Sequence, residues 1–384
     1  MTSPAPHGAR PDVREARELY PAAASLAYFN TASVGLASTT LAEVLHRAVN
    51  EWTARGLDFS ACEAAAERSR GQVARLLGTT PDNLAQIASV SAAAGFVAAQ
   101  LPPASTGWNV VIGEREFSSN HFPWRMLADR GYEVRQVPFR NGGVEPETIE
   151  SYVDGATQLV AFSAVQTASG HRSDIGGIAE IAHAQGAIVF VDGTQAVGAL
   201  SLVEELPSID VLAVPDHKYL LNAARGVGYC YLSTAMQQRF RPTSPGWKAG
   251  RRPAESYFGP TMDLSDTASR FDHSIGWLAA LGDEAALAVF DRFGADAIYA
   301  RNRELTEVLR EALRDAGWPP TELPEVNRST IVAVPLDGRE PGPLLAELAS
   351  RGVVCSARDG NLRLAVNFYN NADDVARLVD ALPR

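Results

Sequence analysis

The sequence is poor in lysine, and this scarcity draws attention to the two lysines that it does contain. Lys218 and Lys248 are the only lysines among the 34 Lys and Arg residues of this 384-residue chain. Arginine therefore supplies the ordinary surface charge, and a lysine is expected to be present for its amine. An arginine guanidinium stays protonated and is a poor nucleophile, whereas a lysine amine becomes reactive once its surroundings lower its pKa.

Cysteine and histidine are also scarce, which argues against a disulfide framework and against a metal centre. The three cysteines, Cys62, Cys230 and Cys355, lie far apart and form no CxxC pair, so neither disulfides nor a structural zinc site are expected. The seven histidines have no HExxH or other metal-ligand spacing, and no metal is expected. Cys230 lies in an apolar run, which predicts a buried strand position.

Positive net charge and long apolar runs are absent as well. The net charge of −11 argues against nucleic acid or an anionic membrane as a partner. No apolar run approaches the roughly 20 residues that cross a bilayer. Residues 1–18 are rich in Pro, Arg and polar residues and contain no apolar signal core, which predicts a short loose arm in a cytoplasmic protein.

Apolar runs alternate with helical stretches along the first two thirds of the chain. This alternation predicts an α/β fold in which a mostly parallel sheet is flanked by helices. One crossover is clear, because apolar positions define a helix over 175–185 and Gly186 then ends it. Strands are predicted at 109–112, 158–163, 187–191, 211–214 and 227–232.

The composition of the sequence changes near residue 245, where Pro and Gly cluster. Beyond it we predict helices at 277–290 and 295–316, strands at 330–334 and 361–366, and a last helix capped by Asn370 or Asn371. We expect an N-terminal arm (1–20), a large domain (21–250) and a smaller α+β domain (251–384). The first part of the large domain is expected to contribute to the small domain and to the substrate pocket.

Two charged residues follow neighbouring predicted strands. Asp192 follows the strand at 187–191, and Lys218 follows the strand at 211–214. Ligands of open α/β sheets bind outside the carboxyl ends of the strands, and a buried carboxylate needs a cationic or hydrogen-bonding partner such as a protonated pyridine nitrogen. Two ordinary roles stay open, namely that Asp192 caps the next helix and that Lys218 forms a surface salt bridge.

Small residues fill the segment from Ser89 to Gly95, ahead of a helical run predicted at 96–101. Free backbone N–H groups at a helix N-terminus suit a phosphate.

Together these segments resemble the class V aminotransferase family of pyridoxal-phosphate enzymes of fold type I, in its branch of isopenicillin N epimerase-like and cysteine desulfurase-like proteins. The resemblance spans most of the chain. The matching segments are Asn30 to Gly35, Glu116 to Trp124, Val165 to Asp174, Val191 to Gly198, His217-Lys218, Gly226 to Tyr231, and Leu362-Arg363 with Tyr369-Asn370.

The resemblance implies roles for these residues toward pyridoxal 5'-phosphate and an amino-acid substrate. Lys218 would bind the cofactor covalently and move the proton at Cα, and Asp192 would pair with the pyridine nitrogen. Arg363 would bind the substrate α-carboxylate through two parallel hydrogen bonds, although a structural ion pair is an alternative for it. The remaining roles are Gln195 and Thr167 at the ring oxygen, Phe117 against the ring face, His217 at the phosphate, and Asn30 and Gln166 in the substrate pocket.

The expected phosphate site departs from the family pattern. Relatives usually have threonine hydroxyls where this chain has Ala92 and Ala93, so binding there would depend on backbone amides. Pro215-Asp216 replaces a small pair, and a carboxylate that faced the phosphate would repel it. The family forms homodimers with sites at the interface, and Ser274 or His273 would replace a threonine that reaches the partner subunit's phosphate.

The resemblance fixes the cofactor but leaves the reaction open. The leading hypothesis is β-elimination from a cysteine S-conjugate in antibiotic metabolism, with decarboxylation-linked deamination close behind. An aminotransferase, an epimerase and an inactive relative that serves as a binding module are the alternatives. A persulfide on Cys355, eight residues before Arg363, is a further alternative to a buried strand cysteine.

Overall fold

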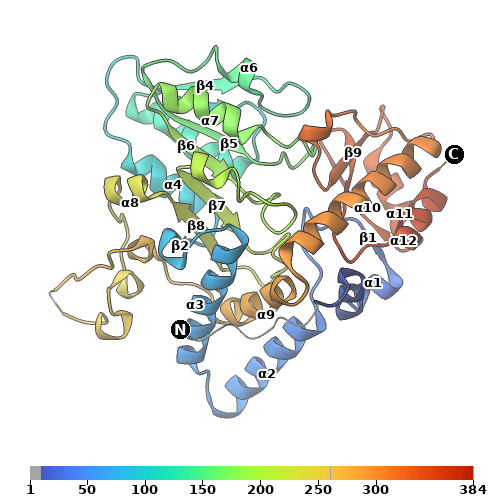
Figure 1. Ribbon diagram of the computed structural model, residues 1–384, viewed down its shortest axis with the longest axis horizontal. Coiled ribbons are helices and arrows are strands. Elements are labelled where there is room, and N and C mark those ends of the chain that lie inside the picture. The colour runs from blue at the N-terminus through green and yellow to red at the C-terminus, as the bar shows by residue number, and fades with distance from the viewer. Residues whose placement is uncertain (1–9, 260, 384) are drawn as a thin grey trace.

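A seven-stranded sheet forms the centre of the large domain in the computed structural model, which describes residues 10–259 and 261–383. Five neighbouring strands are parallel, and β8 and β2 then add antiparallel pairs at one edge. The expected mostly parallel α/β sheet is confirmed (Figure 1). In spatial order the strands are β2 (Leu84–Gln86), β8 (Gly228–Leu232), β7 (Val211–Pro215), β6 (Ile188–Asp192), β5 (Thr157–Ser163), β3 (Asn109–Gly113) and β4 (Glu133–Val137).

The central strands were predictable because both of their faces are buried. Every residue of β3, β6, β7 and β8 is buried, and strands covered on both faces appear in sequence as continuous apolar runs. The predicted strands match these four and β5 to within a residue or two. The edge strand β4 was not predicted, because it is not an apolar run: its Glu133 is exposed at the sheet edge, where charge prevents further pairing.

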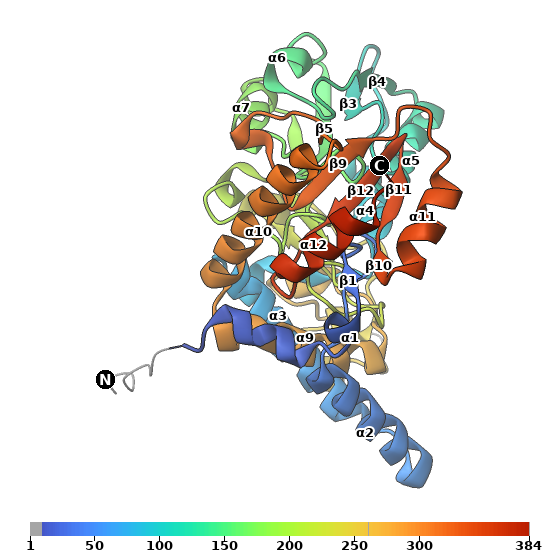
Figure 2. The ribbon, with the colours of Figure 1, turned by 90° about the vertical axis from the view of Figure 1, so that its right-hand side faces the viewer.

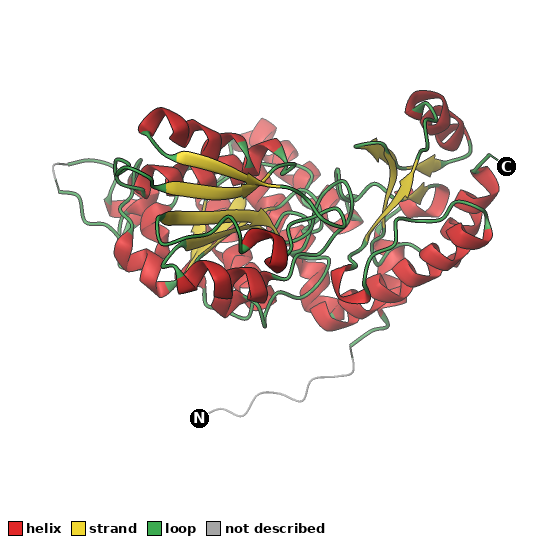
Figure 3. Ribbon diagram, turned by 90° about the horizontal axis from the view of Figure 1, so that it is seen from above, coloured by secondary structure: helices red, strands yellow, loops and turns green. Residues whose placement is uncertain are grey.

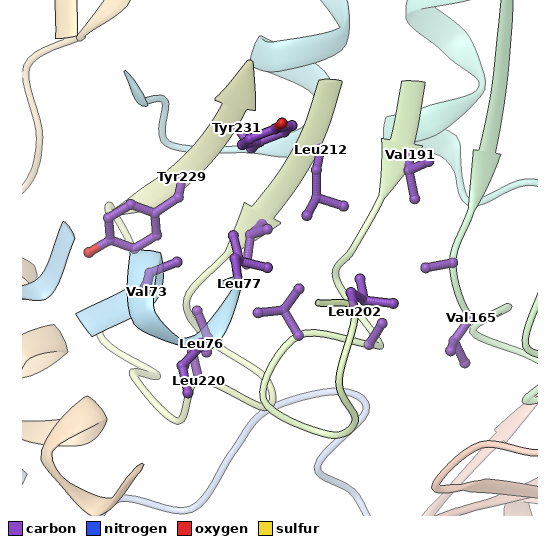
Figure 4. Packing of buried hydrophobic residues seen from close by; sticks show 14 of the residues in the cluster. Val73, Leu76, Leu77, Val165, Val191, Leu202, Leu212, Leu220, Tyr229 and Tyr231 are labelled. Atoms are coloured by element: carbon purple, nitrogen blue, oxygen red, sulfur yellow. The ribbon is translucent and has the colours of Figure 1, made fainter. Parts of the chain in front are cut away.

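Alternate residues of each strand face two separate cores. Val189 and Val191 of β6 pack into one core with Leu77, while Ile188 and Phe190 pack into the other. Figure 4 shows part of the first core, where Val191 and Leu212 project from neighbouring strands of the sheet. The helices that supply these cores are α3 (Phe59–Leu76), α4 (Val90–Gln100), α7 (Ile175–Ala184) and α9 (Trp277–Phe293).

A second, smaller sheet lies beside the first (Figure 3). It has three antiparallel strands in the order β11 (Ser356–Arg358), β12 (Asn361–Ala365) and β9 (Ile331–Pro335). Helices α10 (Ala295–Asp315), α11 (Pro341–Ser350) and α12 (Ala372–Ala381) pack with it. The last helix begins at Asn371 with a capping box, so the second of the two expected caps is correct.

The N-terminal segment joins the small sheet region. β1 (Ala27–Tyr28) pairs in parallel with β10 (Val353–Val354), and Figure 2 shows them beside α12. After β1 the chain enters α2 (Thr39–Arg55), which packs against α9. The boundary predicted at residue 250 stays a prediction, although the packing of α9 against α3 places part of the later chain with the large sheet.

The expected loose arm of residues 1–18 is wrong from Asp12 onward, where a short helix forms; residues 1–9 lie outside the described part. Arg17 forms a two-point ion pair with Asp374 of α12 (2.8 and 3.0 Å). The ring of Tyr20 lies 5.1 Å from that of Tyr369. The polar composition concealed these contacts because the partners are about 350 residues away in sequence.

Helix α4 begins at Val90, six residues earlier than predicted. The Ser89 hydroxyl caps it by accepting a hydrogen bond from the Ala92 amide (3.1 Å). Small residues were interpreted as a segment ahead of the helix, yet alanine is the strongest helix former and serine is a good N-cap.

No helix in residues 10–259 and 261–383 is both long and apolar enough to cross a membrane.

Candidate active site

A cleft of about 250 Å³ opens at the carboxyl edge of the large sheet. It contains the last residues of three strands, namely Ser163 of β5, Asp192 of β6 and Pro215 of β7, as expected for an open α/β sheet. Its other lining residues are Ala32, Ser33, Ser89, Val90, Phe117, Ser119, Val165, Thr167, Thr194, Gln195, His217, Lys218, Arg225, Arg358 and Arg363. The cleft thus brings together segments from the start, the middle and the end of the chain.

Lys218 lies in this cleft on the loop that follows β7. Burial lowers the pKa of its amine to about 8, against the opposing charge of Asp192. The amine lies 5.6 Å from the centre of the Phe117 ring. No carboxylate in the described residues forms a salt bridge with it, and the surface salt-bridge interpretation is therefore wrong. The lowered pKa makes a larger fraction of the amine unprotonated at neutral pH, which is the form that covalent catalysis needs.

Asp192 presents one free carboxylate oxygen to the cleft. Its Oδ1 accepts hydrogen bonds from the amide (2.9 Å) and the hydroxyl of Thr194, while Oδ2 receives none from the described residues. Burial raises the pKa of Asp192, and the charge of Lys218 opposes that rise. Turns rather than a helix follow Asp192, so the helix-cap interpretation is wrong. A buried carboxylate with one open oxygen fits a protonated ring nitrogen.

Arg363 is held in the cleft by neutral oxygens alone. Its Nε donates to Ser356 Oγ (3.1 Å), Nη1 to Thr167 Oγ1 (2.9 Å) and Nη2 to Ser33 Oγ (2.6 Å). The described residues offer it no carboxylate within salt-bridge distance, so the structural ion pair is not found. Burial lowers the pKa of the guanidinium to about 10. A buried cation without an anion is costly, and this guanidinium is positioned for an anionic ligand.

Thr167 links Arg363 to Gln195. Its hydroxyl oxygen accepts from Arg363 and from Gln195 Nε2 (2.8 Å), which leaves the hydroxyl hydrogen for an acceptor. Gln195 Nε2 also donates to the Ala32 carbonyl (3.0 Å), so both amide hydrogens of Gln195 are used within the protein.

The sequence profile of the family described as Aminotransferase class-V matches residues 40–378. The chain belongs to this family. It is 29% identical to isopenicillin N epimerase of Streptomyces clavuligerus over 335 residues, covering 82% of this chain and 83% of that protein. The structure of cysteine desulfurase from Thermococcus onnurineus NA1 matches with a TM-score of 0.81 at 20% identity and covers 97% of each chain. The cystine C–S lyase C-DES, solved with its product cysteine persulfide, matches with a TM-score of 0.82 at 19% identity, over 95% of this chain and 100% of that chain.

This member of the class V aminotransferase family is therefore a pyridoxal-phosphate-dependent enzyme of fold type I. The residues fit the cofactor, because the cleft combines an amine, a buried carboxylate with an open oxygen, and a hydroxyl hydrogen without an acceptor. Phe117 and His217 also line the cleft, as the family resemblance implied.

His217, Arg225 and the start of α4 all line the cleft. His217 has a pKa lowered to about 4 by burial and by the charges of Lys218 and Arg225, so its imidazole is neutral. The first turn of α4 contributes Ser89 and Val90 to the lining, whereas Ala92 and Ala93 do not reach it. The Ala92 amide is bonded to the Ser89 hydroxyl and the Ala93 amide to the Ser89 carbonyl.

Asp216 lies beside the cleft and is not one of its lining residues. It is buried, and its Oδ2 accepts from Asn222 Nδ2 (2.9 Å). Burial and the nearby carboxylate of Asp283 raise its pKa well above the ordinary value, which favours the neutral acid. Its Oδ1 lies 3.9 Å from Nδ1 of the lining residue His217, but in its neutral form Asp216 would not repel a phosphate.

Three other expected residues lie outside the lining. Asn30 bridges to Ala365 in the small sheet region. Gln166 donates to Glu116 Oε1 (2.7 Å) behind the cleft. Ser274 is exposed on the surface, and its role toward a partner subunit stays a proposal.

Several lining residues had no role assigned from the sequence, among them Ser33, Thr194, Arg225 and Arg358, and the same holds for the neighbouring Glu116. Ser33 and Thr194 lie within segments that resemble the family, and their contacts with Arg363 and Asp192 appear only in the fold. Nothing in the sequence distinguishes Arg225 and Arg358 from other arginines, because 32 of the 34 basic residues are arginine. The neighbour, Glu116, accepts from the Ser163 amide (2.9 Å), and its burial raises its pKa to about 7.

Proposed function

We propose that this enzyme releases a thiol from a cysteine S-conjugate by β-elimination. Pyridoxal phosphate supplies an electron sink that stabilises negative charge at Cα. Lys218 takes the Cα proton, and the bonding pair of the C–S bond leaves with the sulfur, which is released as a thiol after protonation. The observation that supports this choice most directly is that the cleft, as lined by the described residues, holds one basic amine and no cysteine.

Cys355 is poorly placed for the persulfide chemistry of a desulfurase. It lies between β10 and β11, packs against the small-domain core and does not line the cleft. Burial raises the pKa of its thiol to about 12, and the thiolate is the reactive form. Sulfur is therefore proposed to leave as part of a thiol and not through an enzyme persulfide.

The other residues of the cleft are proposed to bind and orient. Arg363 binds the α-carboxylate, Asp192 retains the proton on the ring nitrogen, and Phe117 covers the ring face. Thr167, whose hydroxyl hydrogen is free, donates to the ring oxygen in place of Gln195. His217, Arg225 and the first amides of α4 hold the phosphate.

Epimerisation is the second candidate, because the 29% identical relative is named isopenicillin N epimerase. Transamination and decarboxylation-linked deamination are weaker candidates, and a keto-acid requirement would identify the first of them. The homodimer and a place in antibiotic metabolism are proposed from the family resemblance, and the cytoplasmic location stays an expectation from the sequence.

The test of the proposed reaction is product analysis with a panel of S-substituted L-cysteines. We expect a free thiol and pyruvate in equal amounts, many turnovers without a keto acid, and the same rate in Cys355→Ala. Recovery of the D-amino acid with the C–S bond intact would favour the epimerase. A rate that falls sharply in Cys355→Ala, with sulfide formed, would favour a desulfurase.

Arg225 is expected to bind the phosphate of the cofactor and to make no contribution to binding of the pyridine ring. Replacing it by Gln removes a charge-assisted contact and is expected to weaken the binding of pyridoxal phosphate about tenfold. Binding of pyridoxal, which lacks the phosphate, is expected to stay unchanged. Titration of the cofactor-free protein by absorbance measures both. Arg303→Gln, an exposed arginine of α10 outside the cleft, is the control, and equal losses for both ligands would contradict the assignment.

A further inference from the structure

The cleft carries more positive charge than the proposed reaction uses. Lys218, Arg225, Arg358 and Arg363 line it, and Asp192 is the only acidic residue among the lining residues of the described chain. In the proposed function the cofactor phosphate, with a charge of about −2, is held beside Arg225, and the substrate α-carboxylate meets Arg363. Lys218 and Asp192 both act on the cofactor. Arg358 is left without an anion.

The small sheet positions Arg358 beside Arg363. In the β11–β12 ladder Ser356 pairs with Arg363, and Arg358 is two residues further along β11. Directly paired residues share a face, as do residues two apart on one strand. Arg358 and Arg363 are thus diagonal neighbours on one face, with backbones about 7 Å apart. Arg358 is also close enough to act through its charge, which lowers the pKa of both Lys218 and Arg363.

The hairpin that carries Arg358 is fixed at its tip. Asp359 and Gly360 form its two-residue turn, both with positive φ (50° and 75°), which is the backbone of the tightest hairpins. Asp359 also forms a salt bridge with Arg115, next to Glu116 and Phe117. The hairpin tip is therefore attached to the large domain beside the cleft.

The guanidinium of Arg358 is available to a ligand. Its one hydrogen bond goes to the carbonyl of its neighbour Ala357 (2.7 Å), and none of the described carboxylates forms a salt bridge with it. The residue is exposed and yet lines the cleft. An arginine in this setting matches a carboxylate through two parallel hydrogen bonds.

We propose that Arg358 binds a second carboxylate, carried on the side chain of the substrate. The substrate class is then a dicarboxylic amino acid, in which the α-carboxylate meets Arg363 and the distal carboxylate meets Arg358. This assignment rests on the proposed function, in which the substrate is a cysteine S-conjugate. The leaving group would accordingly be a thiol that bears a carboxylate.

The test compares two ligands of the cofactor-loaded enzyme that differ only at the distal group, S-carboxymethyl-L-cysteine and S-carbamoylmethyl-L-cysteine. Binding is measured by the change in cofactor absorbance, and thiol release is measured separately. We expect the carboxylate ligand to bind about tenfold more tightly than the amide. Arg358→Gln is expected to remove that preference and to leave the affinity for the amide unchanged.

Two further variants sharpen the result. Arg358→Glu is expected to shift the preference toward the cationic S-aminoethyl-L-cysteine, and Arg303→Gln is expected to behave as the wild type. The assignment is overturned if the wild type binds the first two ligands equally or binds neither, or if Arg358→Gln weakens both alike. A preference for the carboxylate ligand without thiol release would overturn the lyase reaction and keep the role of Arg358. Thiol release without that preference would keep the lyase reaction and overturn the role of Arg358.

Discussion

Lys218→Ala is expected to abolish thiol release and the absorbance band of the lysine-bound cofactor together. The side chain is proposed to bind the cofactor covalently and to take the Cα proton, and a positioned general base alone contributes about 100-fold to 10,000-fold in rate. We expect a rate loss of about 1,000-fold or more. The absorbance spectrum and an assay of the released thiol check both effects.

The matched control is the other lysine. Lys248 is buried and lies 2.5 Å from Glu63 of α3, outside the cleft. Lys248→Arg keeps that charge and is expected to leave colour and activity intact. Borohydride reduction of the loaded wild type, followed by peptide mass analysis, is expected to locate the cofactor on Lys218. A label on Lys248, or full activity in Lys218→Ala, would refute the assignment.

Arg363→Lys is expected to lower kcat/KM about 100-fold while the loaded protein keeps its colour. The substitution keeps the charge but removes the planar fork that holds Ser33, Thr167 and Ser356 and that matches a carboxylate. Losing one member of such a desolvated pair costs about 2–5 kcal/mol, and about 2.7 kcal/mol corresponds to 100-fold. Steady-state kinetics with an S-substituted cysteine measures the loss.

A control for folding accompanies this variant. The melting temperature of Arg363→Lys with bound cofactor is expected to remain close to that of the wild type, because the contacts of Arg363 are to neutral oxygens and the charge is retained. An unchanged kcat/KM would show that Arg363 does not bind the α-carboxylate. A loss confined to kcat, with the substrate affinity unaltered, would also contradict its role as a clamp.

Prediction from the sequence succeeded where local pattern and buried environment coincide. The strand before Asp192 and the strand before Lys218 are continuous apolar runs because helices cover both of their faces. Because the carboxyl ends of parallel strands lie at one edge of the sheet, the two side chains were expected to meet there. Arg363 was identified through the family resemblance, and its lack of an anionic partner came only from the fold.

The rest of the site depends on contacts that no local pattern encodes. Arg225 and Arg358 are two arginines among 32, and only the path of the chain brings them to the cleft. Ser33 meets Arg363 across 330 residues of sequence. Asp216 was a concern because its neighbours in sequence face the cleft, whereas the backbone turn directs its own side chain toward Asn222. Long-range packing decided each of these cases.

The pairing of β1 with β10 has a consequence for how the protein is made. Ser33 and Arg363 bond across nearly the full length of the chain, and Asn30 bridges to Ala365 beside them. A ribosome therefore exposes the lysine loop well over a hundred residues before it exposes the arginine that binds the substrate. The nascent chain can bury its large sheet first, and a complete substrate-binding cleft forms only when synthesis is almost finished.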